Sequence, residues 1–314
     1  MDELTGLAER FEAGRGPMLA VAYRMLGSLS EAEDAVQEVW LRLSRTDAES
    51  IDNLPAWLRT VVSRVCLDML RARAARPEEP VGERMPEAAG AAEEGGGPED
   101  EALLADSVGR ALLVVLDTLG PAERVAFVLH DLFAVPFEQI APLVGRSPGA
   151  AKKLASRARQ RVRGTPAVPP AELGEQRTVV EAFLSAARSG HLAGLLAVLA
   201  PDVVRRSDPA ALPASSAALL RGADAVARGT ALLAHRSRYA QTALVDGAVG
   251  AVLAPRGRLL AALTFTVGGG RISAYEVIAD PARLAGLELA LLDPVAPVAA
   301  PGSGSQRPGS QQLA

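Results

Sequence analysis

Six basic side chains fall within twelve residues near the middle of the chain, and no acidic residue interrupts them. They are Lys152, Lys153, Arg157, Arg159, Arg161 and Arg163. Side chains of this kind neutralise phosphates, and they can also bond to base edges in the major groove of DNA. The chemistry predicted here is recognition of a polyanion.

A helix is needed to present these cations on one side, and the local sequence predicts one. Ser147 is a good N-cap, and Pro148 suits the first helical position, where its missing N–H costs nothing. An apolar stripe follows at helical spacing: Ala151, Leu154, Ala155, Ala158 and Val162. The helix is therefore expected to bury one side and to offer a purely cationic side.

The preceding residues sharpen this interpretation. Residues 137–144 have the apolar period of a short helix, and a glycine-containing turn at Gly145 follows. A short helix, a tight turn and a capped helix form a helix-turn-helix, whose second helix lies in the major groove. The alternative is a solvated basic helix on a bundle, but the capped turn favours DNA. The candidate DNA contacts are Arg146, Ser147, Lys152, Lys153, Ser156 and Arg157.

Composition limits the class of protein. The chain has 314 residues, enough for two or three domains, and 49% are hydrophobic. The net charge of -4 excludes a globally basic DNA-coating protein. Charge is instead segregated, because residues 78–101 are acidic.

Targeting and redox signals are few. Cys66 is the only cysteine, which suits a reducing cytoplasm. The N-terminus lacks the features of a signal peptide, and no apolar stretch is long enough to span a bilayer. We therefore expect a cytoplasmic protein without a membrane partner.

The first 76 residues predict helices. Ser30 to Glu33 form a capping box that opens a helix with one apolar and one polar face. The polar face carries Asp34, Gln37 and Glu38. It is either an ordinary solvated face or a docking surface for a basic partner, and the residues alone favour neither.

A third helix is expected from Pro55. It is rich in arginine, with Arg59, Arg64 and Arg71 beside Trp57. Such a helix could stack on bases or follow phosphates, although Trp57 is equally well explained as a core residue.

Two boundaries divide the chain. Residues 77–101 are glycine- and glutamate-rich and predict a flexible acidic linker, and a proline-rich stretch follows at 165–170. Beyond it, two helices precede several strands, with hairpin signals at Arg256-Gly257 and Gly268–Gly270, which indicates an α+β domain. From residue 291 we expect a disordered tail.

The motifs of residues 1–163 resemble the bacterial extracytoplasmic-function (ECF) sigma factors of the sigma-70 family. Residues 23–28 with 32–40 are similar to sigma region two, and residues 126–162 are similar to region four. The resemblance implies that Asp34, Gln37 and Glu38 bind core RNA polymerase. It also implies that Trp57, Arg59, Arg64 and Arg71 contact the minus-ten element, and that the helix-turn-helix reads the minus-thirty-five element of promoter DNA.

The resemblance extends to a subgroup with a C-terminal SnoaL-like cone. Three segments are similar to its motifs: residues 81–87, residues 267–271 and residues 280–284. The subgroup implies intramolecular contact of the cone with the sigma domains. The implied contact residues are Val81, Gly82, Pro86, Glu87, Gly268, Gly269, Gly270, Arg271, Asp280, Pro281 and Leu284.

The cone could instead be an enzyme. Its candidate acid–base residues are Asp202, Asp208, His235, Tyr239, Tyr275 and Glu276, which form no recognisable catalytic set. The three histidines lack metal-ligand spacing. We expect no enzyme activity, no metal and no cofactor, and a protein-contacting domain is favoured over a ligand-sensing pocket.

The expected architecture is two all-α sigma domains, the second with a helix-turn-helix, followed by an α+β SnoaL-like cone. The domains are residues 1–76, 102–165 and 166–290, with the linker at 77–101 and the tail at 291–314. The expected function is promoter recognition with core polymerase, modulated in cis by the cone. The alternatives are a one-component helix-turn-helix regulator with a ligand-sensing cone and, more remotely, an isomerase or hydrolase fused to a DNA-binding adaptor.

Overall fold

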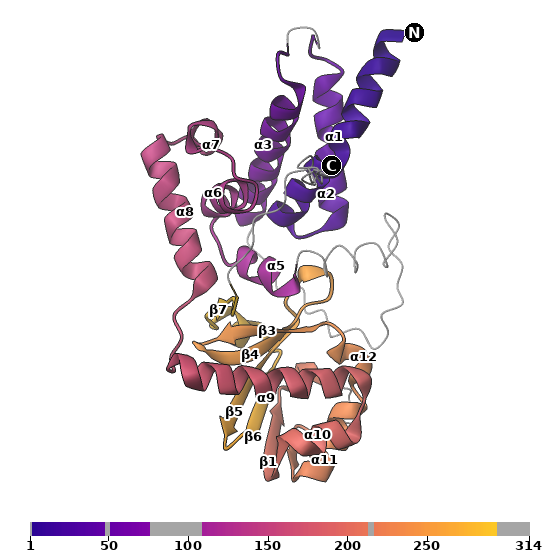
Figure 1. Cartoon of the computed structure of the whole chain (residues 1–314). Coiled ribbons are helices and arrows are strands. Elements are labelled where there is room, and N and C mark those ends of the chain that lie inside the picture. Colours follow the sequence, from indigo (N-terminus) through magenta and orange to yellow (C-terminus); the bar gives the residue numbers. More distant parts are fainter. Residues whose placement is uncertain (1, 48–50, 76–108, 213–216, 294–314) are drawn as a thin grey trace, which may run out of the picture.

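The computed structural model describes residues 2–47, 51–75, 109–212 and 217–293 (Figure 1). The acidic linker expected at 77–101, the contact residues expected at 81–87 and the tail from residue 294 lie outside the described residues. Residues 291–293 belong to the expected tail but are described: the Leu291 N–H donates to the carbonyl of Val162, and Asp293 pairs with Arg177.

The first domain consists of α1 (Asp2–Leu26), α2 (Leu29–Leu43) and α3 (Leu54–Ala75). The capping box expected at Ser30 is wrong in register. Gly27 ends α1 with φ of 78°, so Ser28 is already extended and its Oγ accepts a hydrogen bond from the Glu31 N–H at 3.5 Å. Asn53 Oδ1 accepts from the Ala56 N–H in the same way before α3.

The second domain contains α5 (Arg110–Asp117), α6 (Pro121–Phe127), the π-helical turn η2 (Val128–Leu132), α7 (Phe137–Val144) and α8 (Pro148–Arg163). Ser147 Oγ accepts from the Ala150 N–H, so the predicted N-cap of α8 is confirmed. The predicted apolar stripe of α8 is buried except for Leu154, which is partly exposed. The helical stretch from Pro121 to Leu132 is α6 followed directly by the π-helical turn η2.

The third domain is α+β. Its helices are α9 (Pro170–Ser189), α10 (Leu192–Val198), α11 (Ala223–Ala231), α12 (Ala234–Ser237) and α13 (Pro281–Ala285), with 3-10 turns η3 (Pro209–Ala211) and η4 (Pro255–Gly257). Its strands are β1 (Leu199–Ser207), β2 (Leu219–Arg221), β3 (Ala240–Val245), β4 (Ala248–Leu253), β5 (Ala261–Gly268), β6 (Arg271–Ile278) and β7 (Leu289–Ala290). The sheet order is β2-β1-β6-β5-β4-β3-β7, and only β1 and β6 pair in parallel. The expected fold class is confirmed.

Turn chemistry explains the hairpins. Gly269 and Gly270, with φ of 57° and 71°, connect β5 to β6 as the glycine run predicted. The β3–β4 hairpin turns at Asp246-Gly247, a common two-residue hairpin signal that the sequence analysis did not use. The short strands β2 and β7 were also missed, because three and two residues carry no alternation.

The two faces of the sheet belong to different hydrophobic cores. Ala243 and Val245 of β3, Val252 of β4 and Ala254, directly after β4, join the core of the two helical domains. The alternate residues Val249, Ala251 and Leu253 of β4 pack in a second core, with α9, α10 and α11. Figure 1 shows α5 between the sheet and the N-terminal helices, so the first core runs through all three domains.

Candidate polymerase, DNA and inter-domain surfaces

The acidic face of α2 borders a groove against α1. Asp34 and Gln37 are exposed and line this groove, whose volume is about 410 Å³. Phe11 and Trp40 lie in it with ring centroids 5.0 Å apart. The predicted trio is therefore divided, because Glu38 does not line the groove.

Glu38 instead pairs with Arg42, one turn along α2, at 2.9 Å. The groove holds further acidic residues, Glu12 of α1 and Glu33 of α2, which the sequence analysis did not select. Their contribution depends on the packing of α1 on α2, which the sequence does not reveal. The acidic surface is larger than the predicted set.

The candidate minus-ten residues lie on two faces of α3. Trp57, Arg64 and Arg71 are seven residues apart, or two turns, and share a face. Arg64 and Arg71 are exposed, whereas Trp57 is partly buried and packs on the core. Arg59 lies on another face, where its Nη2 donates to Oε1 of Gln139 in α7 at 3.5 Å.

The helix-turn-helix is formed by α7, a turn and α8. Gly145 adopts φ of 66° and ends α7, and the Arg146 N–H donates to the carbonyl of Ala141 at 3.0 Å. The predicted residues Arg146, Ser147, Lys152, Lys153, Ser156 and Arg157 are all exposed. Lys152, Lys153 and Ser156 lie opposite the buried stripe, and we call these three residues the free face of α8.

The rest of the basic set is not purely cationic, contrary to the expectation. Glu123 of α6 pairs with Arg157 at 3.4 Å and with Arg161 at 2.8 Å. Asp131 of η2 pairs with Arg159 at 2.6 Å. These carboxylates are distant in sequence, so the uninterrupted basic run gave no sign of them.

Asp131 also carries a shifted pKa. Burial raises the pKa of this carboxyl above its ordinary value, and the nearby Arg159 opposes the shift. Among the described residues, acidic partners lie on both flanks of α8, and none pairs with Lys152 or Lys153 of the free face.

The two helical domains contact each other directly. Arg124 of α6 is almost fully buried, pairs with Asp117, and donates from Nε to the Arg24 carbonyl of α1 at 3.4 Å. The Arg24 guanidinium lies 5.5 Å from the centroid of the Phe133 ring. Between the same two domains, the face of α3 that carries Arg59 lies toward α7, where Arg59 bonds to Gln139.

Helix α5 docks on the sheet. The Ala111 N–H donates to Oε1 of Gln241 in β3 at 2.8 Å, and the Arg110 guanidinium lies 5.5 Å from the Tyr239 ring centroid. A Cβ atom added to Gly257 of η4 would lie 2.6 Å from Leu113 Cδ1, so only glycine permits this approach. We call these contacts the α5–sheet interface.

A second contact joins the end of α8 to β7. The Leu291 N–H donates to the carbonyl of Val162 at 2.8 Å. Gly164, with φ of 57°, lies very close to Ala290. A Cβ atom added to Gly164 would lie 2.4 Å from the Cβ atom of Ala290. The sequence analysis missed these residues.

The contact residues expected from the C-terminal motifs bond elsewhere. The Gly270 N–H donates to Glu175 of α9, and Arg271 donates to the Leu199 carbonyl. Asp280 caps α13 by accepting from the Arg283 N–H, with Pro281 in its first turn. These hydrogen bonds stay within the α+β domain. The inter-domain contacts are made by β3, β7 and η4 instead, because that edge of the sheet faces α5 and α8.

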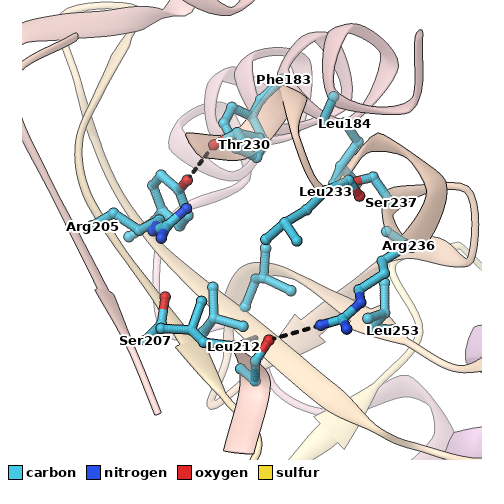
Figure 2. A pocket seen from close by; sticks show the side chains of 16 residues that line it. Phe183, Leu184, Arg205, Ser207, Leu212, Thr230, Leu233, Arg236, Ser237 and Leu253 are labelled. Carbon is cyan, nitrogen blue, oxygen red and sulfur yellow. Dashed lines mark hydrogen bonds between the residues drawn. The ribbon is translucent and has the colours of Figure 1, made fainter. Parts of the chain in front are cut away.

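The α+β domain contains a cavity of about 70 Å³ between the sheet and helices α9, α11 and α12 (Figure 2). Of the six acid–base candidates, only Tyr275 lines it, and its Oη lies 2.6 Å from Thr230 Oγ1. Burial raises the pKa of Tyr275, while Thr230 and Arg205 oppose the shift. Asp208 and Glu276 are both bound by Arg283.

Neither membrane-spanning nor metal-binding features stand out where the structure is described. Within those residues, no helix is long and apolar enough to cross a membrane. The same residues contain no group of three or more His, Cys, Asp or Glu side chains placed to hold a metal ion.

The helix-turn-helix of α7 and α8 packs beside the helical domain α1 to α3, which is the arrangement of helices expected from the resemblance to sigma regions two and four. Comparisons with known proteins agree. Residues 10–76 match Sigma-70 region 2, and residues 109–162 match Sigma-70, region 4.

Relatives similar over nearly their whole length come from Mycobacterium tuberculosis. The probable ECF RNA polymerase sigma factor SigI is 35% identical over 287 residues, which cover 90% of this chain and 97% of the relative. The ECF RNA polymerase sigma factor SigJ is 37% identical, over 89% of this chain and 93% of the relative. The crystal structure of SigJ has 34% identity and a TM-score of 0.44, and covers 89% of this chain and 98% of that one.

The chain belongs to the family of ECF RNA polymerase sigma factors. Its function is that of a sigma factor, which is promoter recognition in the initiation of transcription. The family assignment confirms the main prediction from sequence and sets aside the one-component regulator and the fused enzyme as descriptions of the whole chain.

Proposed function

We propose that the SnoaL-like domain, residues 166–293, controls this sigma factor in cis by holding its two sigma domains together. The observation that carries the proposal is the shared core, in which residues of β3, β4 and β7 pack with residues of α1 to α8. A sigma factor must place its two DNA-binding domains on separate promoter elements. The packed arrangement, in which Arg59 is bonded to Gln139, is then the closed state.

We assign functions to the remaining surfaces from the family resemblance and from the exposure of their side chains. In this proposal, Asp34, Gln37 and Glu38, with Glu12 and Glu33, bind a basic surface of core polymerase in the cytoplasm. Trp57, Arg59, Arg64 and Arg71 contact the minus-ten element.

The minus-thirty-five element is contacted by α8 and the turn before it. The free face of α8 is aimed at base edges, and Arg146, Ser147 and Arg157 flank it. The exposure of these side chains supports the assignment.

Opening the closed state requires α1 and α3 to separate from α6, α7 and η2, and the sheet opposes this through the core that it shares with both sigma domains. A ligand or partner shifts such an equilibrium only as far as its affinities for the two states differ. Core polymerase satisfies this condition if it binds the sigma domains only when they are apart.

The experiment is run-off transcription with core polymerase and three proteins: the full chain, a chain ending at Arg163 and a chain ending at Arg271. The first truncation removes the whole SnoaL-like domain, and the second removes β6 and β7 with the contact of Leu291 on Val162. We expect transcription levels that differ from the full chain and from each other. If all three proteins gave equal transcription, the domain would not regulate and the proposal would be overturned.

A further inference from the structure

The cavity of the SnoaL-like domain is small, and its mostly apolar lining includes two arginines. Its walls come from α9, β1, η3, α11, α12 and strands β3 to β6, and most of the lining side chains are apolar. The apolar wall includes Phe183, Leu184, Leu233 and Leu253. Figure 2 shows Arg205 and Ser207 on one side of this wall and Arg236 on the opposite side.

Among the residues that the structure describes, three polar atoms at this cavity are buried without a hydrogen-bond partner: Arg205 Nε, Ser207 Oγ and Arg236 Nε. The side chain of Arg205 is only 3% exposed. Its Nη2 donates to the Ala217 carbonyl at 3.5 Å, and Nη1 of Arg236 donates to the Ala211 carbonyl at 3.2 Å. Burying polar groups without hydrogen-bond partners costs folding free energy. Three such atoms around one cavity therefore indicate that a group from outside the chain supplies the missing hydrogen bonds.

Both arginines also lack a counter-ion among the residues that the structure describes here. None of the sixteen lining residues is an aspartate or a glutamate. Asp208 and Glu276 follow the lining residues Ser207 and Tyr275 in their strands, and both bind Arg283, at 2.6 Å and 3.0 Å. The nearest carboxylates in sequence are therefore already neutralised by a third arginine.

We propose that this cavity binds a small organic anion, a carboxylate attached to a short apolar body. The carboxylate accepts hydrogen bonds from Arg205 and Ser207, and the apolar body lies against Leu233 and Leu253 below Arg236. Arginine suits this task because its planar fork bonds both oxygens of a carboxylate. The apolar walls disfavour inorganic phosphate or sulfate, which carry polar oxygens on every side.

The size of the cavity limits the ligand. An engineered cavity of about 150 Å³ admits benzene, so a volume near 70 Å³ suits a chain of a few carbon atoms. None of the lining side chains is a carboxylate or a histidine that could act as a general base, which favours binding over turnover. The proposal goes beyond cis control and does not depend on it.

The test is isothermal titration calorimetry on the full chain with sodium butyrate. Butyramide, which has the same shape without the charge, and sodium phosphate are the comparison probes. The variant is Arg205→Met. The matched control is Arg228→Met, which removes an exposed arginine of α11 outside the cavity.

We expect saturable binding of butyrate at one site and no binding of butyramide or phosphate. Arg205→Met should weaken binding at least tenfold, about 1.4 kcal/mol, while Arg228→Met leaves it unchanged. Thermal unfolding gives a second readout, because a buried arginine without a counter-ion costs stability. Arg205→Met should therefore unfold at the same temperature or higher.

The proposal is overturned if butyrate does not bind, if butyramide binds equally, or if Arg205→Met binds butyrate as the wild type does. A large loss of stability in Arg205→Met would assign the arginine to the fold rather than to a ligand. If that variant does not fold, Leu233→Phe decides, because it fills the cavity and must abolish binding without removing any charge.

Discussion

The Oε1 atom of Gln241, in the sheet, lies 2.8 Å from the backbone nitrogen of Ala111, in the first turn of the helix that opens sigma region four. A side chain of the SnoaL-like domain thus accepts from one of the N–H groups that a helix leaves free at its N-terminus. The equivalent bond inside the domain joins Gln176 Oε1 to the Val249 nitrogen at 3.2 Å. One of these two glutamine–backbone hydrogen bonds joins two domains and the other lies within one domain, so the same substitution at each glutamine can be compared.

The first prediction uses this pair. Gln241→Leu leaves the Ala111 N–H without its partner, which should weaken the α5–sheet interface by about 1–3 kcal/mol. We expect a larger radius of gyration by small-angle X-ray scattering and a changed level of run-off transcription. Gln176→Leu should lose similar stability without expanding the molecule. Equal scattering profiles for the two variants would show that the interface does not hold the closed state.

The second prediction concerns polymerase binding. Reversing both charges, Asp34→Lys with Glu38→Lys, should abolish binding of core polymerase in a pull-down while the circular dichroism spectrum is unchanged. The physical reason is that like charges facing each other across an interface cost several kcal/mol. Asp224→Lys, on an exposed face of α11, is the control and should bind normally. Normal holoenzyme assembly by the double variant would contradict the docking assignment.

The third prediction separates base contacts from phosphate contacts on α8. Lys153→Ala should change promoter preference, because a lost base contact costs about 1–3 kcal/mol at one position. Arg163→Ala should weaken binding on every sequence and flatten the dependence of log K on log salt by about one unit. Fluorescence anisotropy over a range of salt concentrations measures both. Uniform losses for both variants would remove the base-reading role.

The fourth prediction follows from Glu123. Glu123→Gln frees Arg157 and Arg161, which the carboxylate otherwise holds. We expect tighter non-specific DNA binding and a salt dependence steeper by about one to two units. Asp131 is not a matched control because it also pairs with an arginine of α8, Arg159, so Glu138→Gln on an exposed position of α7 serves instead. An unchanged slope would mean that Glu123 does not compete with phosphate.

The fifth prediction is a pH dependence. Burial tends to raise the pKa of Asp208, but hydrogen bonds from the Asp280 and Ala279 backbone and from Arg283 outweigh it and hold the pKa below its ordinary value. A carboxyl with a lowered folded pKa stabilises the fold above its unfolded pKa, about 3.9, and loses this contribution as pH falls through the folded value.

Asp208→Asn should accordingly lower the unfolding temperature at pH 7, and the difference from the wild type should shrink below about pH 4. Differential scanning calorimetry across this range measures the effect. Asp224→Asn shows what removal of an exposed carboxylate does by itself. A constant difference at all pH values would contradict the assigned cause.

Most helices could be predicted from the sequence because their signals are local. Ser147, Pro148 and the stripe from Ala151 to Val162 specify α8 without any tertiary information, and the glycine run specifies the β5–β6 turn. The fold class followed from such signals together with the family resemblance.

What could not be predicted depends on residues that meet only after folding. Glu123 meets Arg157 because α6 crosses α8, and Gln241 reaches Ala111 because η4 and β3 form the edge that faces α5. The buried Arg205 and the partly buried Arg236 belong to different elements, and no spacing in the sequence relates them. The site assignments on α2, α3 and α8 stay predictions until the variants above are measured.

The shared core also has a consequence for biosynthesis. It contains both Phe11 and Leu289, so it is incomplete until the chain has been translated at least as far as residue 289. Contacts between residues so distant in sequence form late, since the intervening chain must be closed first. The helices of the two sigma domains therefore leave the ribosome before the strands that complete their core, and these helices must exist for a time without the sheet packed on them.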